Sequence, residues 1–206
     1  MNNVDRIFAG QGEAAQFAEG YAAYFSTLLQ GLDRNAVARV IATLVQAREQ
    51  GKKIFFIGNG GSAATASHFA NDVAIGTRCA RKPFRAISLT DNHAIITAVA
   101  NDDGFEQIFV KQLGVLMETG DLLIAISASG NSPNLVAAVE YARACGNHTI
   151  GFTGFDGGKL RQRCSDCIHV PTERGEYGPV EAVHAFLLHL IGNYLLQLVK
   201  REGGGA

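Results

Sequence analysis

Two pairs of ionisable side chains have the residue types and the spacing for acid/base or metal chemistry. His68 and Asp72 stand four residues apart in "SHFANDVA" and therefore share one face of a predicted helix. Glu181 and His189 lie in the apolar segment 179–199, where helical geometry separates them by about 80° around the axis. Two imidazoles and two carboxylates, if brought together, would suit proton transfer or a divalent-metal site.

The same side chains also have an ordinary structural interpretation. A His–Asp pair at this spacing is common on helix surfaces. The polar residues of 179–199, which include His184, are expected to hydrogen-bond within an interface if they are buried. Because the residues alone do not bring the two helices together, both interpretations stay open at this point.

Two loops rich in small polar residues follow apolar, strand-like segments. "GNGGS" (58–62) has glycines that allow backbone N–H groups to turn toward an anion, and "SASGNS" (127–132) is rich in hydroxyl groups. Each loop alone is also consistent with a helix cap or a turn. Two such loops after two strands of one sheet favour a phosphate monoester as ligand. The residues predicted to bind it are Gly60, Gly61, Ser62, Ser127, Ser129, Asn131 and Ser132.

Other glycine-rich patterns give no nucleotide signature. The chain has no G-x-x-x-x-G-K-[ST] motif, and "GNGGSA" lacks the spacing of a dinucleotide-binding fingerprint. A third loop, "TGFDGG" (153–158), is interpreted as a plain turn. An ATP-binding or dinucleotide-binding protein is therefore disfavoured.

Short apolar runs alternate with helical patterns, and this alternation predicts how the loops are positioned. Continuous apolar runs are typical of parallel strands that are covered on both faces. We therefore predict a single α/β domain, a doubly wound, five-stranded parallel sheet flanked by helices. The expected strands are 53–58, 84–89, 121–127, 148–153 and 167–171, and the helical patterns between them are 62–74, 91–101, 104–116 and 132–146.

The predicted domain spans residues 1–200, and its flanks are helical and unusually apolar. N-terminal helices are expected within 1–50, an αβα core over 51–172, a C-terminal helix over 179–200 and a flexible tail over 201–206. Segments 13–30 and 179–199 carry more apolar surface than one amphipathic stripe requires. Such helices usually bury a second face against another subunit, so we expect a homo-oligomer.

Composition narrows the class of protein. The chain has 206 residues, 47% of them hydrophobic, and a formal net charge of −1, which gives no general attraction to nucleic acid or to anionic membranes. We find no signal peptide and no run approaching the ~20 apolar residues of a membrane span, so a cytoplasmic protein is expected. The four cysteines, including the C-x-x-C of Cys164 and Cys167, are expected to be reduced thiols.

Several motifs occur together in an order that resembles a known family. The chain contains "GNGGSAATASHFANDVA", "TAVANDDGFEQIFVKQL", "GDLLIAISASGNSPNLVAAVEYAR", "TIGFTGFDGGKL" and "VEAVHAFLLHLI". In this order the motifs resemble the sugar isomerase (SIS) domain proteins, and among them the phosphoheptose isomerase family. The resemblance implies a homotetramer with active sites between subunits. It also implies isomerisation of sedoheptulose 7-phosphate to a manno-heptose 7-phosphate through an enediol.

The resemblance also implies roles for individual residues. It adds Asn59 near the phosphate and Asp102 of "ANDDG" as a sugar contact. It places one zinc ion per site, with His68, Asp72, Glu181 and His189 as ligands and Asp72, Glu181 and His189 as candidate catalytic residues. The family typically has glutamate at the position of Asp72 and glutamine at that of Glu181. These differences indicate a side branch and leave open which carboxylate is the base.

Two classes of function remain at this stage. In the first, an isomerase, Asp72 or Glu181 would move a proton between C1 and C2 and His189 a proton between the two oxygens. In the second, a non-catalytic SIS protein, the fold would bind a phosphosugar or a protein partner, as replication-initiation cofactors of this family do. The ionisable cluster favours the enzyme, because binding alone does not require it.

Overall fold

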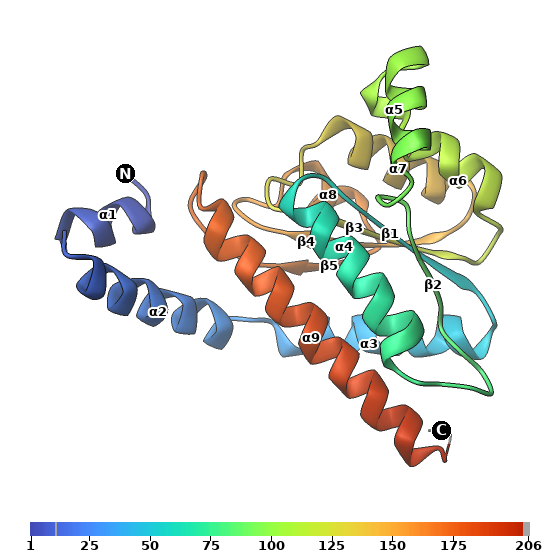
Figure 1. Ribbon diagram of the computed structural model, residues 1–206, viewed down its shortest axis with the longest axis horizontal. Helices are drawn as coiled ribbons and strands as arrows, with labels where there is room; N and C mark the ends of the chain where they lie inside the picture. Colours follow the sequence, from blue (N-terminus) through green and yellow to red (C-terminus); the bar gives the residue numbers. More distant parts are fainter. Residues whose placement is uncertain (11, 204–206) are drawn as a thin grey trace.

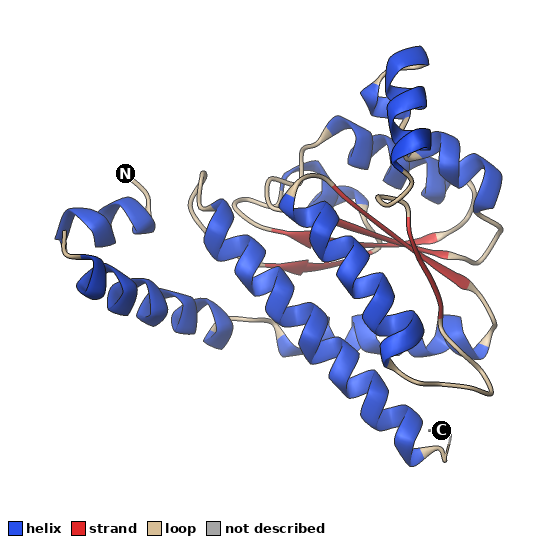
Figure 2. Cartoon of the chain, viewed as in Figure 1, coloured by secondary structure: helices blue, strands red, loops and turns tan. Residues whose placement is uncertain are grey.

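The computed structural model of the chain describes residues 1–10 and 12–203. It contains a parallel five-stranded sheet in the order β2-β1-β3-β4-β5, which confirms the predicted α/β fold (Figures 1 and 2). The strands are β1 Lys53–Gly58, β2 Arg85–Ser88, β3 Leu122–Ser127, β4 His148–Thr153 and β5 Asp166–His169. All five lie within one or two residues of the predicted ranges.

Helices cover both faces of this sheet because successive strand residues point to opposite sides. Ile54 and Phe56 of β1 pack in one core layer, whereas Phe55 and Ile57 pack in the other. The first layer is completed by α3 (Arg34–Glu49), α4 (Gly61–Asn71) and α9 (Tyr177–Arg201). The second is completed by α6 (Val110–Leu116), α7 (Pro133–Ala144) and α8 (Gly158–Arg163).

Some of the predicted helix boundaries were wrong. Segment 104–116 is a short 3₁₀ turn, η2 (Phe105–Gln107), followed by α6, because Ile108 and Phe109 between them insert into the second core layer. The predicted helix 62–74 is α4 followed by a π-helical turn, η1 (Asp72–Gly76). Helix α8 was not predicted at all.

The carboxyl-terminal helix differs from the prediction at both ends. It spans Tyr177–Arg201, and Glu202 forms an ion pair with Arg48 at 2.8 Å, so the predicted tail over 201–206 begins too early; residues 204–206 lie outside the described residues. By length and composition α9 would suffice to cross a membrane, which corrects the expectation that no segment approaches this limit. Ten of its residues are nevertheless buried against the domain.

Three helices lie at the periphery of the core. Helices α1 (Asn3–Gly10), α2 (Ala14–Gln30) and α5 (His93–Asp102) contain no buried residue, and Figure 1 shows α1 and α2 at one side of the molecule and α5 rising from the opposite end. In the carboxyl-terminal part of α2, Phe25, Leu28 and Leu29 are partly buried where they pack against the first core layer. These helices are the ones that a partner subunit would cover, and the expected homo-oligomer stays a prediction.

Candidate functional site

The two serine-bearing loops meet at the carboxyl edge of the sheet, between neighbouring strands β1 and β3. They line a small cavity of about 160 Å³ together with the start of α9. In open parallel sheets this edge is where ligands bind. The described lining residues are Asn59, Ser62, Ile126, Ser127, Ala128, Ser129, Ser132, Leu135, Tyr177 and Glu181. We name this cavity the serine pocket.

Close backbone packing holds the first loop against the start of α4. A Cβ atom on Gly58 would lie 2.3 Å from the carbonyl oxygen of Ser62, so only glycine allows the turn. The Asn59 amide exchanges two hydrogen bonds, of 2.9 and 2.8 Å, with the Asn134 amide of α7. The first loop is therefore tied to the start of α7, the helix that follows the second loop.

In the second loop, some polar groups are used by the fold and others are free. Ser127 Oγ accepts a hydrogen bond from the Gly130 N–H at 3.1 Å, and Gly130 has a φ of +63°. Asn131 donates from its side chain to the Ser129 carbonyl at 3.0 Å. Ser132 stands at the N-cap of α7 but makes no side-chain cap bond within the described structure. The hydroxyl of Ser132 is thus available to a ligand near two helix N-termini.

The histidines and Asp72 gather further along the α4–α9 pair. Asp72 Oδ1 lies 3.5 Å from His68 Nε2, and Asp72 Oδ2 lies 3.5 Å from His189 Nδ1. The two imidazole rings are 4.9 Å apart, edge to face. One ligand atom from each residue lies within 4.8 Å of the others, and we call these three residues the histidine trio. The predicted approach of the two helices is therefore present in a single chain.

Glu181 does not join this group, which corrects the prediction of a four-residue cluster. Its carboxylate lies at the start of α4, where a Cβ on Gly61 would be 2.6 Å from Oε2. The reason is the rise of the helix, since eight residues carry His189 about 12 Å along α9 from Glu181. The family resemblance implied the four-residue cluster, but the two side chains face different parts of α4.

Two glycines, one in η1 and one in α9, lie beside Asp72. A Cβ on Gly192 of α9 would lie 3.5 Å from Asp72 Cβ, and one on Gly76 would lie 3.6 Å away. Asp72 is also the first residue of the π-turn η1, a feature that is frequent at functional sites. The local backbone is thus shaped around this carboxylate.

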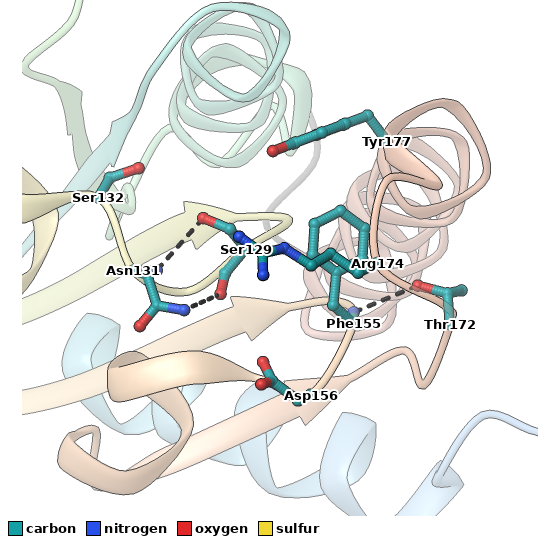
Figure 3. A pocket seen from close by; sticks show the side chains of 8 residues that line it. All are labelled: Ser129, Asn131, Ser132, Phe155, Asp156, Thr172, Arg174 and Tyr177. Atoms are coloured by element: carbon teal, nitrogen blue, oxygen red, sulfur yellow. Dashed lines mark hydrogen bonds between the residues drawn. The ribbon is translucent and has the colours of Figure 1, made fainter. Parts of the chain in front are cut away.

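A second, larger cavity of about 550 Å³ adjoins the serine pocket (Figure 3). Ser129, Ser132 and Tyr177 line both cavities. The other lining residues of the larger cavity, which we name the arginine cavity, are Asn131, Phe155, Asp156, Thr172 and Arg174. Sequence reasoning missed the last four; the only signal was the position of "TGFDGG" after β4, at the same edge of the sheet.

The segment that carries Arg174 is held by the N-terminal helices. The buried Glu176 carboxylate accepts hydrogen bonds from the Asn3 N–H at 2.6 Å and from the Tyr24 hydroxyl at 2.6 Å. Burial and the adjacent Glu176 carboxylate raise the pKa of Tyr24. Arg6 of α1 pairs with Glu173. One wall of the arginine cavity is therefore anchored to residues at the other end of the chain.

Two other predicted features lie away from the cavities. Asp102 is exposed near the end of α5, where its Oδ1 accepts from the Asn101 amide at 2.7 Å, and it lines neither cavity. Cys164 and Cys167 are free thiols beside Gly151, and burial raises the pKa of both. Raised thiol pKa values lower the reactivity of these cysteines, and their reduced state stays a prediction.

His184 is buried within the domain and not in an interface. Its ring lies 6.0 Å from Phe152, edge to face, and neither ring nitrogen has a hydrogen-bond partner among the described residues. Burial lowers the pKa of His184 to about 4; the Thr153 backbone, which raises it, and the charge of nearby His169, which lowers it, have smaller effects. It is therefore a neutral core residue at neutral pH.

With this geometry in place, comparison with known proteins identifies the family. The SIS domain matches residues 16–154, more than half of the chain. This chain belongs to the SIS domain family. The family match ends before α9. Two of the four predicted metal ligands, Glu181 and His189, therefore lie outside the matched residues.

Relatives within the SIS family narrow the comparison. The chain is 41% identical to the phosphoheptose isomerase of Trichlorobacter lovleyi over 170 residues, covering 81% of this chain and 86% of that protein. The structure of phosphoheptose isomerase GmhA from Neisseria gonorrhoeae matches with a TM-score of 0.77 at 33% identity, covering 88% and 95% of the two chains. The structure of a phosphoheptose isomerase from Francisella tularensis matches with a TM-score of 0.76 at 31% sequence identity. The match covers 87% of this chain and 98% of that chain.

Proposed function

We propose that the chain is a phosphoheptose isomerase, which interconverts sedoheptulose 7-phosphate and D-glycero-D-manno-heptose 7-phosphate through an enediol. The observation that carries the proposal is the similarity to phosphoheptose isomerases over more than four fifths of both chains. The arrangement of the site supports it, because a hydroxyl-rich pocket and an acid/base group lie on the same pair of helices.

An extended phosphosugar would span the two parts of the site. The phosphate would lie in the serine pocket, near the N-termini of α4 and α7, with Asn59, Gly60, Gly61 and the loop hydroxyls as donors. The histidine trio lies roughly 10 Å further along α4, seven residues after Gly61. This separation suits a sugar whose phosphate and carbonyl are at opposite ends, and Asp102 would contact such a chain only from another subunit.

The trio is suited to zinc. Two imidazoles and one carboxylate, with ligand atoms within 4.8 Å of one another, form a donor set typical of catalytic zinc, which leaves a further position free. His68, Asp72 and His189 would hold the ion. When bound, zinc would polarise the substrate carbonyl and stabilise negative charge on its oxygen.

Proton transfer falls to residues of the trio and not to Glu181. Asp72 would move the proton between C2 and C1, and His189 would move a proton between the two oxygens. Glu181 is placed beside Gly61, at the phosphate end, and we assign it contacts with sugar hydroxyls near that end.

We further propose a cytoplasmic homotetramer. The support is the set of helices without buried residues, α1, α2 and α5, together with the partly exposed Phe186, Leu190 and Tyr194 on α9. Such apolar surface is typical of subunit interfaces.

A non-catalytic phosphosugar-binding protein is the second candidate. The same serine pocket favours it, and the histidine trio distinguishes the two, since binding alone needs no acid/base group at the far end of the ligand.

The deciding experiment is a proton NMR time course in deuterated water with sedoheptulose 7-phosphate, with and without zinc or a chelator. Aldose signals with deuterium at C2 are expected. Binding of the phosphosugar without any exchange would contradict the isomerase and leave the binding protein.

A further inference from the structure

The arginine cavity opens onto the same serines that line the serine pocket. Ser129, Ser132 and Tyr177 are shared by the two cavities, so a phosphate held by the serine loop would be exposed to the arginine cavity on one side. Figure 3 shows the Arg174 side chain extending into this space from the segment before α9. The shared wall makes Arg174 a neighbour of the phosphate site.

The charges that line the site favour a cation there. Glu181 in the serine pocket and Asp156 in the arginine cavity are acidic, and a phosphate monoester adds up to two further negative charges. Among the described residues that line either cavity, Arg174 is the one with a permanent positive charge. Hydroxyls and helix N-termini supply donors but only partial charge.

Arg174 is also free to act on a ligand. Within the described part of the chain its side chain makes no ion pair and no hydrogen bond with protein, although Asp156 lines the same cavity. Its backbone is held by Glu176, which is buried and bonded to Asn3 and Tyr24. A fixed backbone with an uncommitted guanidinium suits a residue whose partner is the ligand.

We propose that Arg174 is a substrate-binding residue that pairs with the phosphate of the phosphosugar from the arginine cavity. The inference rests on the proposed function for the identity of the sugar, but binding of phosphate itself tests it separately. An arginine fork brings a full positive charge and two parallel N–H donors to the phosphate oxygens, which a single hydroxyl does not.

The test is a ³¹P NMR titration of the purified protein with inorganic phosphate, in Arg174→Gln, Arg174→Lys and wild type. Because the side chain has no protein partner, we expect neither variant to disturb the fold. The dissociation constant of phosphate should rise about tenfold in Arg174→Gln and less in Arg174→Lys, which keeps the charge but loses the fork. Arg201→Gln, which removes an exposed arginine at the far end of α9 and outside both cavities, is the matched control and should leave binding unchanged.

Kinetics with sedoheptulose 7-phosphate provide the second readout, where KM should rise about as much as the phosphate dissociation constant while kcat stays within about twofold. Equal phosphate binding by wild type and Arg174→Gln overturns the inference. Equal weakening by Arg201→Gln, or no phosphate binding by wild type, also overturns it. If wild type fails to turn over the heptose phosphate but the phosphate titrations behave as expected, the proposed function fails and the role of Arg174 stands.

Discussion

The buried His184 predicts a specific loss of stability in mild acid. In the unfolded chain a histidine titrates near pH 6.5, whereas burial lowers the pKa of His184 in the folded protein to about 4. Above pH 6.5 both states hold a neutral ring, so His184 contributes no pH dependence. Between pH 6.5 and pH 4 only the unfolded chain takes up the proton, and folding stability falls as the pH falls.

The magnitude follows from the two pKa values. Each pH unit in this window costs about 1.4 kcal/mol, so at pH 5 His184 alone lowers the free energy of unfolding by about 2 kcal/mol, and at pH 4 by about 3 kcal/mol. The ring is 1% exposed and its nitrogens have no partner among the described residues, so solvent does not screen this effect appreciably.

Urea unfolding at pH 7 and pH 5, at one fixed protein concentration, measures the effect. Other groups also titrate, so the informative quantity is the difference between wild type and His184→Met, which cannot be protonated. The loss between the two pH values should be about 2 kcal/mol smaller in this variant. His148→Gln, which removes an exposed histidine paired with Asp166 at 3.0 Å, is the control. An equal loss in wild type and His184→Met would refute the reasoning.

Three further predictions concern the site. Asp72→Asn should lower kcat by about 10²–10⁴-fold and Glu181→Gln by much less, measured as isomerisation of sedoheptulose 7-phosphate; the reverse order would make Glu181 the base. His68→Ala should weaken zinc binding at least about tenfold in a competition titration with a chromophoric chelator, whereas the exposed His93→Ala should not. Gly130→Ala should raise KM and destabilise the protein in thermal unfolding, because its Cβ would lie 2.0 Å from the Gly157 carbonyl; wild-type values would show that the loop can rearrange.

The sheet was predictable because buried parallel strands appear as continuous apolar runs. "KIFFIG" and "HTIGFT" coincide with β1 and β4, since both faces of these strands are covered and the pattern depends only on local sequence. Helix ends were less predictable. Segment 104–116 has a regular helical pattern, and only the packing of Ile108 and Phe109 in the second core layer divides it into η2 and α6.

The site was predictable where it depended on strand ends and on helix spacing. Ser62 and Ser127 lie at the ends of adjacent strands, so their place in one pocket could be foreseen. The separation of Glu181 from His189, in contrast, depends on the rise along α9 and not on its angular repeat. Arg174 lies in an irregular segment without periodicity. The segment that carries Arg174 is held by the hydrogen bond from Tyr24 to Glu176. These two residues are 152 positions apart in the chain, and no local pattern reveals such a contact.

The bonds from α1 to the segment before α9 have a practical consequence for the study of this protein. The Asn3 N–H and Arg6 bind Glu176 and Glu173, so a start site chosen downstream of Arg6 would remove bonds that hold the wall that carries Arg174. The other terminus follows the far end of α9, and 25 helical residues place that end about 37 Å from Tyr177. A carboxyl-terminal tag is therefore the appropriate choice for every measurement described above.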